Sequence, residues 1–109
     1  MEMLHRTNDC IQYIEDNLEG EIEMEELARL TLHSKFHFQR LFSLVTGCTV
    51  AEYIRRRRLT LAAQELNSPN TKVIDVAFRY GYETPESFSK AFRKAHGVSP
   101  SQVRESGTP

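Results

Sequence analysis

The sequence of 109 residues has no tryptophan, only two cysteines, four prolines and five glycines, and no long hydrophobic run. Cys10 and Cys48 are far apart and form no Cys-x-x-Cys motif, which argues against a disulfide framework and favours reduced thiols in the cytoplasm. No segment approaches the length of a membrane span, and no signal peptide opens the sequence. With 39% hydrophobic residues, we expect one small domain or two very small ones.

The chain also has almost no net charge, but its charges are unevenly distributed. Residues 1–33 hold nine Asp or Glu against two Lys or Arg, whereas residues 34–109 hold six against twelve, which gives net charges of −7 and +6. A basic body behind an acidic segment is compatible with a polyanionic partner. The acidic segment itself is interpreted as a solvated face, with a protein-binding face or a surface that avoids polyanions as the alternatives.

Catalytic and metal-binding constellations are missing as well. No nucleophile, base and orienting group occur together, so we expect no enzyme and no cofactor. His33 and His37 have the i, i+4 spacing of a helical metal pair, but no third ligand accompanies them. We therefore expect no metal site.

One fourteen-residue segment occurs twice, at Ser34–Gly47 and again fifty positions later at Thr84–Gly97. Each copy begins with a hydroxyl residue suited to capping a helix and ends with a glycine suited to stopping it. The register continues beyond the glycines, because Thr49 and Ser99 each begin a capping-box pattern. The repeated unit is therefore predicted to be a helix followed directly by another helix.

The helical period divides each copy into two faces. One face is apolar and is predicted to be buried; it comprises Phe38, Leu41, Phe42 and Val45 in the first copy and Phe88, Ala91, Phe92 and Ala95 in the second. The other face is mainly polar and is predicted to point outward; it comprises Phe36, Gln39, Arg40 and Ser43, and then Glu86, Ser89, Lys90 and Arg93. A helix-turn-helix consists of a short helix, a tight turn and a longer helix with a polar outer face, and both copies fit this pattern.

The patterns along the whole chain predict an all-α fold of seven helices with two helix-turn-helix subdomains. The expected helices cover residues 7–18, 24–31, 34–47, 49–67, 72–80 and 84–97, with a short last helix from 99. We expect a first subdomain over 1–49, a linker helix over 50–67 and a second subdomain with a C-terminal tail over 68–109. Either abundance controls the protein or a sensing domain follows Pro109, and the linker-like composition of the tail favours the second.

Several segments together resemble the DNA-binding domain of AraC/XylS-type bacterial transcription regulators, over about residues 11–104. They are Leu27-Ala28, Ser34–Phe42, Tyr53-Ile54-Arg55, Ala77 with Gly81-Tyr82, Phe88–Phe92 and Gly97–Pro100. Phe36–Arg40 looks closest to compact members that contain little besides this domain. The resemblance implies two helix-turn-helix units joined by a long helix, each with one helix in a major groove. It also implies a regulator, and by analogy an activator, that works in the bacterial cytoplasm and associates with the nucleoid when bound.

The resemblance implies base contacts from Phe36, Gln39 and Arg40 in the first unit and from Pro85, Glu86, Ser89 and Lys90 in the second. Pro85 and Glu86 depart from the common pattern, and Glu86 repels phosphate, so we expect the second unit to act largely as an anchor. We expect phosphate contacts from cap hydroxyls, helix N-termini and cations, namely Ser34, Arg56, Thr84, Arg93, Lys94 and Ser99.

The two unlike outer faces predict a monomer on an asymmetric site of about 20 base pairs of double-stranded DNA. Adjacent major grooves lie about 34 Å apart, and the linker helix would be about 25 Å long, so we expect the DNA to bend if the linker holds the units closer than that. The consecutive arginines Arg55–Arg58 span about 300° of a helix and cannot share one face. One or two are expected to contact phosphate or an RNA polymerase subunit, and the others to be solvated or to form salt bridges.

A helical protein-interaction module that uses the same faces is the competing hypothesis. The two differ in salt dependence, because only a DNA-binding protein releases counterions from several phosphates.

Overall fold

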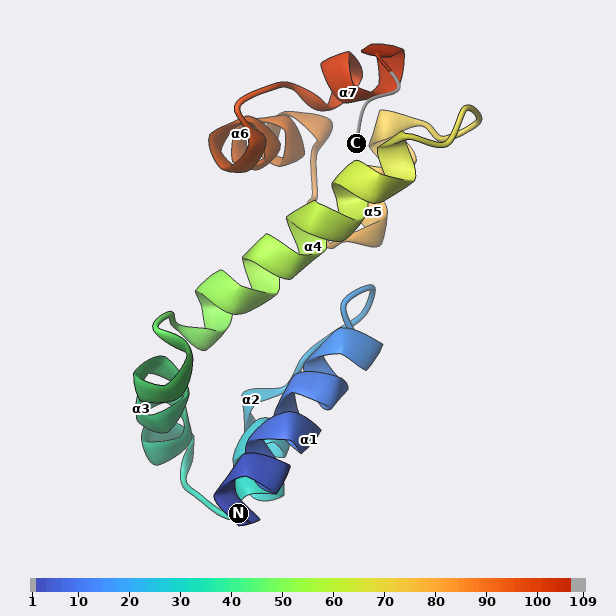
Figure 1. Cartoon of the computed structure of the whole chain (residues 1–109). Coiled ribbons are helices and arrows are strands. Elements are labelled where there is room, and N and C mark those ends of the chain that lie inside the picture. The colour runs from blue at the N-terminus through green and yellow to red at the C-terminus, as the bar shows by residue number, and fades with distance from the viewer. Residues whose placement is uncertain (1, 107–109) are drawn as a thin grey trace. The chain divides into compact units, whose positions relative to one another are not determined.

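The computed structural model describes the backbone of residues 2–106 and the side chains of residues 8–105. Within these residues the chain forms helices and no strand, which confirms the all-α prediction (Figure 1). In chain order they are α1 Glu2–Asp16, α2 Met24–Thr31, α3 Lys35–Thr46, α4 Val50–Leu66, α5 Val73–Arg79, α6 Pro85–His96 and α7 Pro100–Ser106. None of the helices in this described part is long and apolar enough to cross a membrane.

The chain forms two compact units, Met1–Arg55 and Arg56–Pro109, called unit 1 and unit 2 below. The core of unit 1 contains Cys10, Ile14, Leu18, Leu27, Ala28, Phe38, Phe42, Val50 and Ile54. The core of unit 2 contains Leu59, Ala62, Leu66, Val76, Ala77, Tyr80, Phe88, Phe92 and Val103. The predicted three-part division at 49 and 67 stays a prediction, and the tail beyond Ser106 lies outside the described residues.

The first helix differs from its predicted bounds at both ends. It begins at Glu2 instead of residue 7 and ends at Asp16 instead of residue 18. The early end has a local cause, because the Asn17 side chain donates to the Tyr13 carbonyl oxygen at 2.7 Å and thereby replaces the next helical bond. Leu18 follows in the turn and is still buried.

The repeated helices α3 and α6 begin at their predicted caps. The Ser34 hydroxyl accepts a hydrogen bond from the His37 backbone N–H at 3.2 Å, and the Thr84 hydroxyl accepts one from the Ser87 backbone N–H at 3.1 Å. Each bond satisfies an amide that would otherwise have no partner in the first turn. Pro85 occupies the first position of α6, where its missing N–H removes no helical bond.

The same two helices end at glycines in the left-handed conformation. Gly47 has a φ of 80° and Gly97 a φ of 78°, and the N–H of each donates to the carbonyl oxygen four residues earlier. The predicted capping boxes then begin α4 and α7. In the first box the Thr49 N–H donates to the Glu52 side chain at 2.9 Å, and the Glu52 N–H donates to the Thr49 hydroxyl at 3.1 Å. Ser99 and Gln102 form the same two bonds at 2.8 and 3.2 Å.

One part of the predicted apolar stripes is wrong. The four phenylalanines of the stripes, Phe38, Phe42, Phe88 and Phe92, are buried, but Val45 is 55% exposed and Ala95 is exposed as well. Both residues have the angle of the apolar stripe but lie in the last turn of their helix, two positions before the closing glycine. The exposure of these two side chains shows that angle alone overestimates the buried stripe in the last turn.

The turn between α2 and α3 contains Leu32 in the left-handed conformation, with a φ of 61°. The following N–H, of His33, donates to the Ala28 carbonyl oxygen at 3.1 Å. This bond spans the end of α2 as in a Schellman motif, whose left-handed position usually holds glycine. Leu32 is the only non-glycine residue with a positive φ in the described part of the chain.

The turn between α5 and α6 uses the same bond with a different residue. Gly81 takes the left-handed conformation with a φ of 87°, and the Tyr82 N–H donates to the Ala77 carbonyl oxygen at 3.0 Å. The capping residue Thr84 follows Gly81 by three positions, whereas Ser34 follows Leu32 by two. The turn of unit 2 is therefore one residue longer than the turn of unit 1.

Candidate nucleic-acid interface

The outward face of α3 presents an aromatic ring beside polar side chains. Phe36 is 69% exposed, and Gln39 and Arg40 are exposed as well. The helix beneath them is fixed by the ring of Phe42, which packs against Phe38 at 5.9 Å and against Tyr53 at 5.7 Å between centroids. The structure thus brings the three predicted base-contacting residues of unit 1 to the outer side of one anchored helix.

A salt bridge connects the start of α3 to α2. Lys35 Nζ lies 3.0 Å from Glu25 Oε1, and this hydrogen bond, together with the charge of Lys35, holds the pKa of Glu25 below its usual value of 4.5. Arg40 lies one helical turn further on and forms no ion pair within residues 8–105. Its guanidinium is therefore available to an external anion or base edge.

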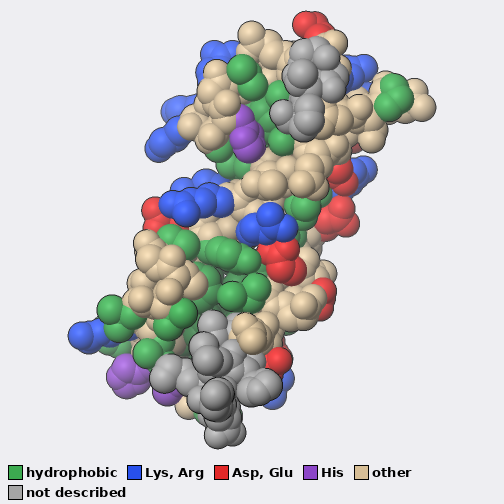
Figure 2. All heavy atoms as spheres, viewed as in Figure 1, with side chains coloured by type: hydrophobic (Ala, Val, Ile, Leu, Met, Phe, Trp, Pro, Cys, Tyr) green, Lys and Arg blue, Asp and Glu red, His purple; other side chains and the backbone are tan. Residues whose placement is uncertain are grey.

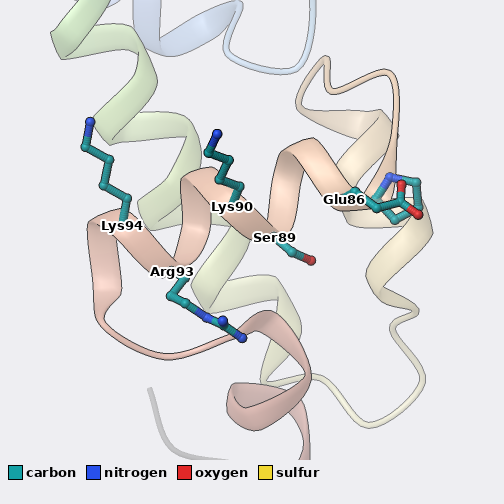
Figure 3. Close-up of a pocket in the computed structure, with 6 residues that line it drawn as sticks. Glu86, Ser89, Lys90, Arg93 and Lys94 are labelled. Carbon is teal, nitrogen blue, oxygen red and sulfur yellow. The ribbon is translucent and has the colours of Figure 1, made fainter.

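The outward face of α6 forms a shallow hollow of about 660 Å³, lined by Pro85, Glu86, Ser89, Lys90, Arg93 and Lys94. Figure 3 shows Lys90 and Lys94 extending in the same direction, whereas Ser89 and Arg93 leave the helix on another side and Glu86 lies at its first turn. The structure thus brings all four predicted base-contacting residues of unit 2 together with two of the predicted phosphate contacts. Three cations and one carboxylate make the surface basic on balance.

Buried rings support α6 from beneath, as they support α3. The Phe88 ring packs against Tyr82 at 5.4 Å and against Phe92 at 5.6 Å between centroids. His96 continues the row and forms a hydrogen bond of 3.1 Å between Nε2 and the Leu59 carbonyl oxygen of α4. Because α6 is fixed at both ends, its outer side chains are presented on a rigid element.

The three hydroxyls predicted to contact phosphate are engaged as caps. Ser34, Thr84 and Ser99 each accept a backbone N–H from the helix that they begin. The Thr84 hydroxyl also donates to Ser87 Oγ at 3.0 Å, so it has little remaining capacity for an external oxygen. A phosphate at these helix starts would contact backbone amides more readily than the hydroxyls.

The arginines of α4 lie on more than one face, as their spacing predicts. Arg55 and Arg56 are exposed, whereas Arg57 and Arg58 are half-buried. Arg56 is thus accessible for the phosphate contact predicted for it. No group of three or more His, Cys, Asp or Glu side chains that could hold a metal occurs among the residues described.

Sequence reasoning missed one exposed residue on α3. Leu44 is 74% exposed and lines a second hollow, of about 400 Å³, together with His33, His37, Arg40 and Leu41. The signal was present in the sequence, because Leu44 lies four residues after Arg40 and therefore on the same side of the helix.

Comparison with known proteins identifies the chain's relatives. The family described as "Helix-turn-helix domain" matches residues 27–106. The transcriptional activator AarP of Providencia stuartii is 39% identical over 101 residues, which cover 93% of this chain and 75% of AarP. The multiple antibiotic resistance protein MarA of Escherichia coli K12 is 35% identical over 97 residues, which cover 89% of this chain and 76% of MarA.

Among solved structures, the DNA-binding domain of the global transcriptional factor AdpA, in complex with a target DNA, superposes with a TM-score of 0.76 at 27% identity. The match covers 91% of this chain and 89% of that domain. A probable AraC family transcriptional regulator from Rhodopseudomonas palustris superposes with a TM-score of 0.84 at 25% identity, over 96% of this chain and 99% of that chain. The chain therefore belongs to the AraC/XylS family of transcription regulators, and its helix-turn-helix domain covers residues 27–106.

Proposed function

We propose that the protein is a transcription activator that binds double-stranded DNA as a monomer and inserts α3 and α6 into successive major grooves of one asymmetric site. The observation that carries the proposal is the repeat of two helices, each anchored by a buried aromatic pair. Their outer faces are unlike, and Arg40 and Lys90 on them form no ion pair with residues 8–105. The AdpA domain was solved in complex with a target DNA, which supports DNA as the partner.

In unit 1 the proposed roles follow from side-chain chemistry. Arg40 donates two hydrogen bonds to guanine O6 and N7, a contact worth about 1–3 kcal/mol of discrimination when bidentate. Gln39 bonds to adenine N6 and N7, and the exposed Phe36 ring packs on a thymine methyl group. Unit 1 is thus proposed to supply most of the sequence preference.

In unit 2 the proposed base contacts come from Pro85, Glu86, Ser89 and Lys90. The Glu86 carboxylate accepts from cytosine N4, and Lys90 donates to guanine as a point charge without the planar fork of arginine. Arg93 and Lys94 bind phosphate beside them, as does Arg56 on α4. This unit is proposed to contribute more affinity than discrimination, because three of its side chains are cations and one is an acid.

The regulator is further proposed to act in the bacterial cytoplasm, on the nucleoid, and to contact RNA polymerase when bound at a promoter. An arginine of α4 that does not face DNA is the proposed polymerase contact. Both statements rest on the family and on the exposed arginines of α4.

Titration with a random duplex at two salt concentrations tests the proposal against a protein-interaction module. A DNA-binding regulator loses affinity steeply with salt, with a slope of about −0.9 in log K per phosphate neutralised. A selection from a random duplex pool then provides the preferred site. Weak duplex binding at low salt, or a pool that shows no enrichment, would reject the DNA-binding assignment.

A further inference from the structure

A leucine is exposed on α3 in line with the proposed base-reading residues. Leu44 is 74% exposed, although α3 buries two phenylalanines on its opposite side. We propose that Leu44 extends the base-reading row of α3 by contacting the 5-methyl group of a thymine beyond the base that Arg40 reads. This inference rests on the proposed function and names a further specificity-determining residue for it.

The spacing of Phe36, Arg40 and Leu44 supports one continuous row. Each step of four residues advances about 6 Å along a helix and rotates by about 40°. Leu44 therefore follows Arg40 on a gently turning line and lies about 12 Å along the axis from Phe36. With successive base pairs about 3.4 Å apart, Leu44 falls about two base pairs beyond Arg40 if α3 follows the groove.

The surroundings of Leu44 fit a base edge. The hollow of about 400 Å³ beside it is lined by the apolar side chains of Leu41 and Leu44 and by the polar ones of Arg40, His33 and His37. Figure 2 shows histidine and hydrophobic side chains next to each other over α3. Among residues 8–105 no carboxylate lines this hollow, so none of these side chains repels the phosphates that flank a groove. A thymine presents both an apolar methyl group and a hydrogen-bond acceptor in the major groove, which matches such a lining.

The repeat places a different group at the matching position of α6. Fifty residues after Leu44 stands Lys94, which lines the α6 hollow and is proposed to bind phosphate. The two helices thus differ at the end of the row. Unit 1 has Leu44, an apolar group that can distinguish bases, and unit 2 has Lys94, a charge that cannot. This difference agrees with the division of roles proposed above.

The test uses the duplex selected by the whole protein and replaces each thymine in turn by uracil, which removes only the 5-methyl group. The unmodified protein is expected to lose about fourfold in affinity at one thymine beyond the guanine read by Arg40, the loss that corresponds to one buried methyl group. Leu44→Ala is expected to bind the thymine and uracil duplexes equally at that position. Val45→Ala is the matched control, because this neighbour is also exposed but faces about 100° away.

The outcomes separate the two proposals. If no duplex is selected at all, the proposed function and this inference both fail. If a site is selected but Leu44→Ala keeps the full uracil profile of the unmodified protein, Leu44 contacts no thymine and this inference is rejected while the proposed function stands. If Val45→Ala changes the profile in the same way, the row through Leu44 is wrong. Circular dichroism of both variants checks that the helices are intact.

Discussion

The turns of the two helix-turn-helix units share a hydrogen bond but differ in length and in the residue that carries the left-handed conformation. In unit 1 the left-handed residue is Leu32, and the capping residue of the next helix follows two positions later. In unit 2 the left-handed residue is Gly81, and the capping residue follows three positions later. The bond across the helix end is 3.1 Å long in one turn and 3.0 Å in the other. The difference shows that the bond geometry is maintained when the loop gains a residue and that glycine is favourable there without being required.

The helices before the two turns also differ on their exposed sides. When Ala28 is matched with Ala77, Glu25 matches Ile74 and Arg29 matches Phe78. Unit 1 has ion pairs at these positions, from Glu25 to Lys35 and from Arg29 to Glu26, whereas Ile74 and Phe78 are exposed apolar side chains in unit 2. The units therefore share a core pattern but not a surface pattern.

The largest expected effect comes from the aromatic pairs. Phe92→Ala removes a fully buried ring from unit 2, and Phe42→Ala removes a nearly buried one from unit 1, each at about 3–5 kcal/mol of unfolding free energy. Because the units have separate cores, hydrogen exchange should increase mainly in the unit that carries the change. Equal acceleration of amides in α2 and α5 by either variant would show that the units unfold as one.

The next effect concerns the two outer faces. Arg40→Ala is expected to lose about 1–3 kcal/mol of preference for the selected duplex over one with the contacted guanine replaced. Lys94→Ala should weaken binding to all duplexes similarly and lower the salt slope by about 1. Competition binding at two salt concentrations measures both quantities. Equal losses on selected and random duplex for both variants would contradict the role of Arg40.

An exchange between the turns should produce effects of opposite sign. Leu32→Gly removes the backbone strain of a left-handed leucine whose side chain is 70% exposed. Glycine makes the unfolded chain more flexible, which offsets part of this, so we expect the free energy of unfolding to rise by about 0.5–1 kcal/mol. Gly81→Ala should cost about 1 kcal/mol from the backbone alone, since nothing lies within 4 Å of the added carbon. Urea unfolding measures both. A loss of stability in Leu32→Gly would mean that the leucine side chain contributes packing that outweighs the strain.

The smallest effect involves the Glu25–Lys35 bridge, whose side chains are 68% and 54% exposed. The hydrogen bond from Lys35 lowers the pKa of Glu25 from its usual value of 4.5. The bridge therefore stabilises the fold fully above pH 4.5, and this stabilisation is lost as the pH falls through the lowered pKa. Glu25→Gln should slightly lower the thermal midpoint at pH 7 but not at pH 3. A difference that persists at pH 3 would point to packing rather than charge.

Much of the fold could be predicted because its signals are local. Ser34, Thr84, Gly47 and Gly97 mark the ends of helices through bonds to their own helix, and the structure confirms each of them. The left-handed conformation of Leu32 could not be predicted, because leucine disfavours it and nothing in the local sequence marks this position.

The candidate site was predictable to a similar extent. The helical period identifies which side chains of α3 and α6 face outward, and the exposure of Phe36, Arg40 and Lys90 agrees with it. The period does not show where along a helix the packing stops, which is why it wrongly predicts that Val45 and Ala95 are buried. The individual DNA contacts stay predictions.

The buried thiol of unit 1 has a practical consequence. Burial raises the pKa of Cys10 to about 11, with a contribution from Asp9, and the thiol lies 3.5 Å from the Leu27 carbonyl oxygen, to which it donates. Thiol reagents require the thiolate and access to the sulfur, so they can modify Cys10 only when α1 separates from α2. Unit 2 has no cysteine. With Cys48 replaced by serine, the rate of thiol labelling would report the opening of unit 1 alone.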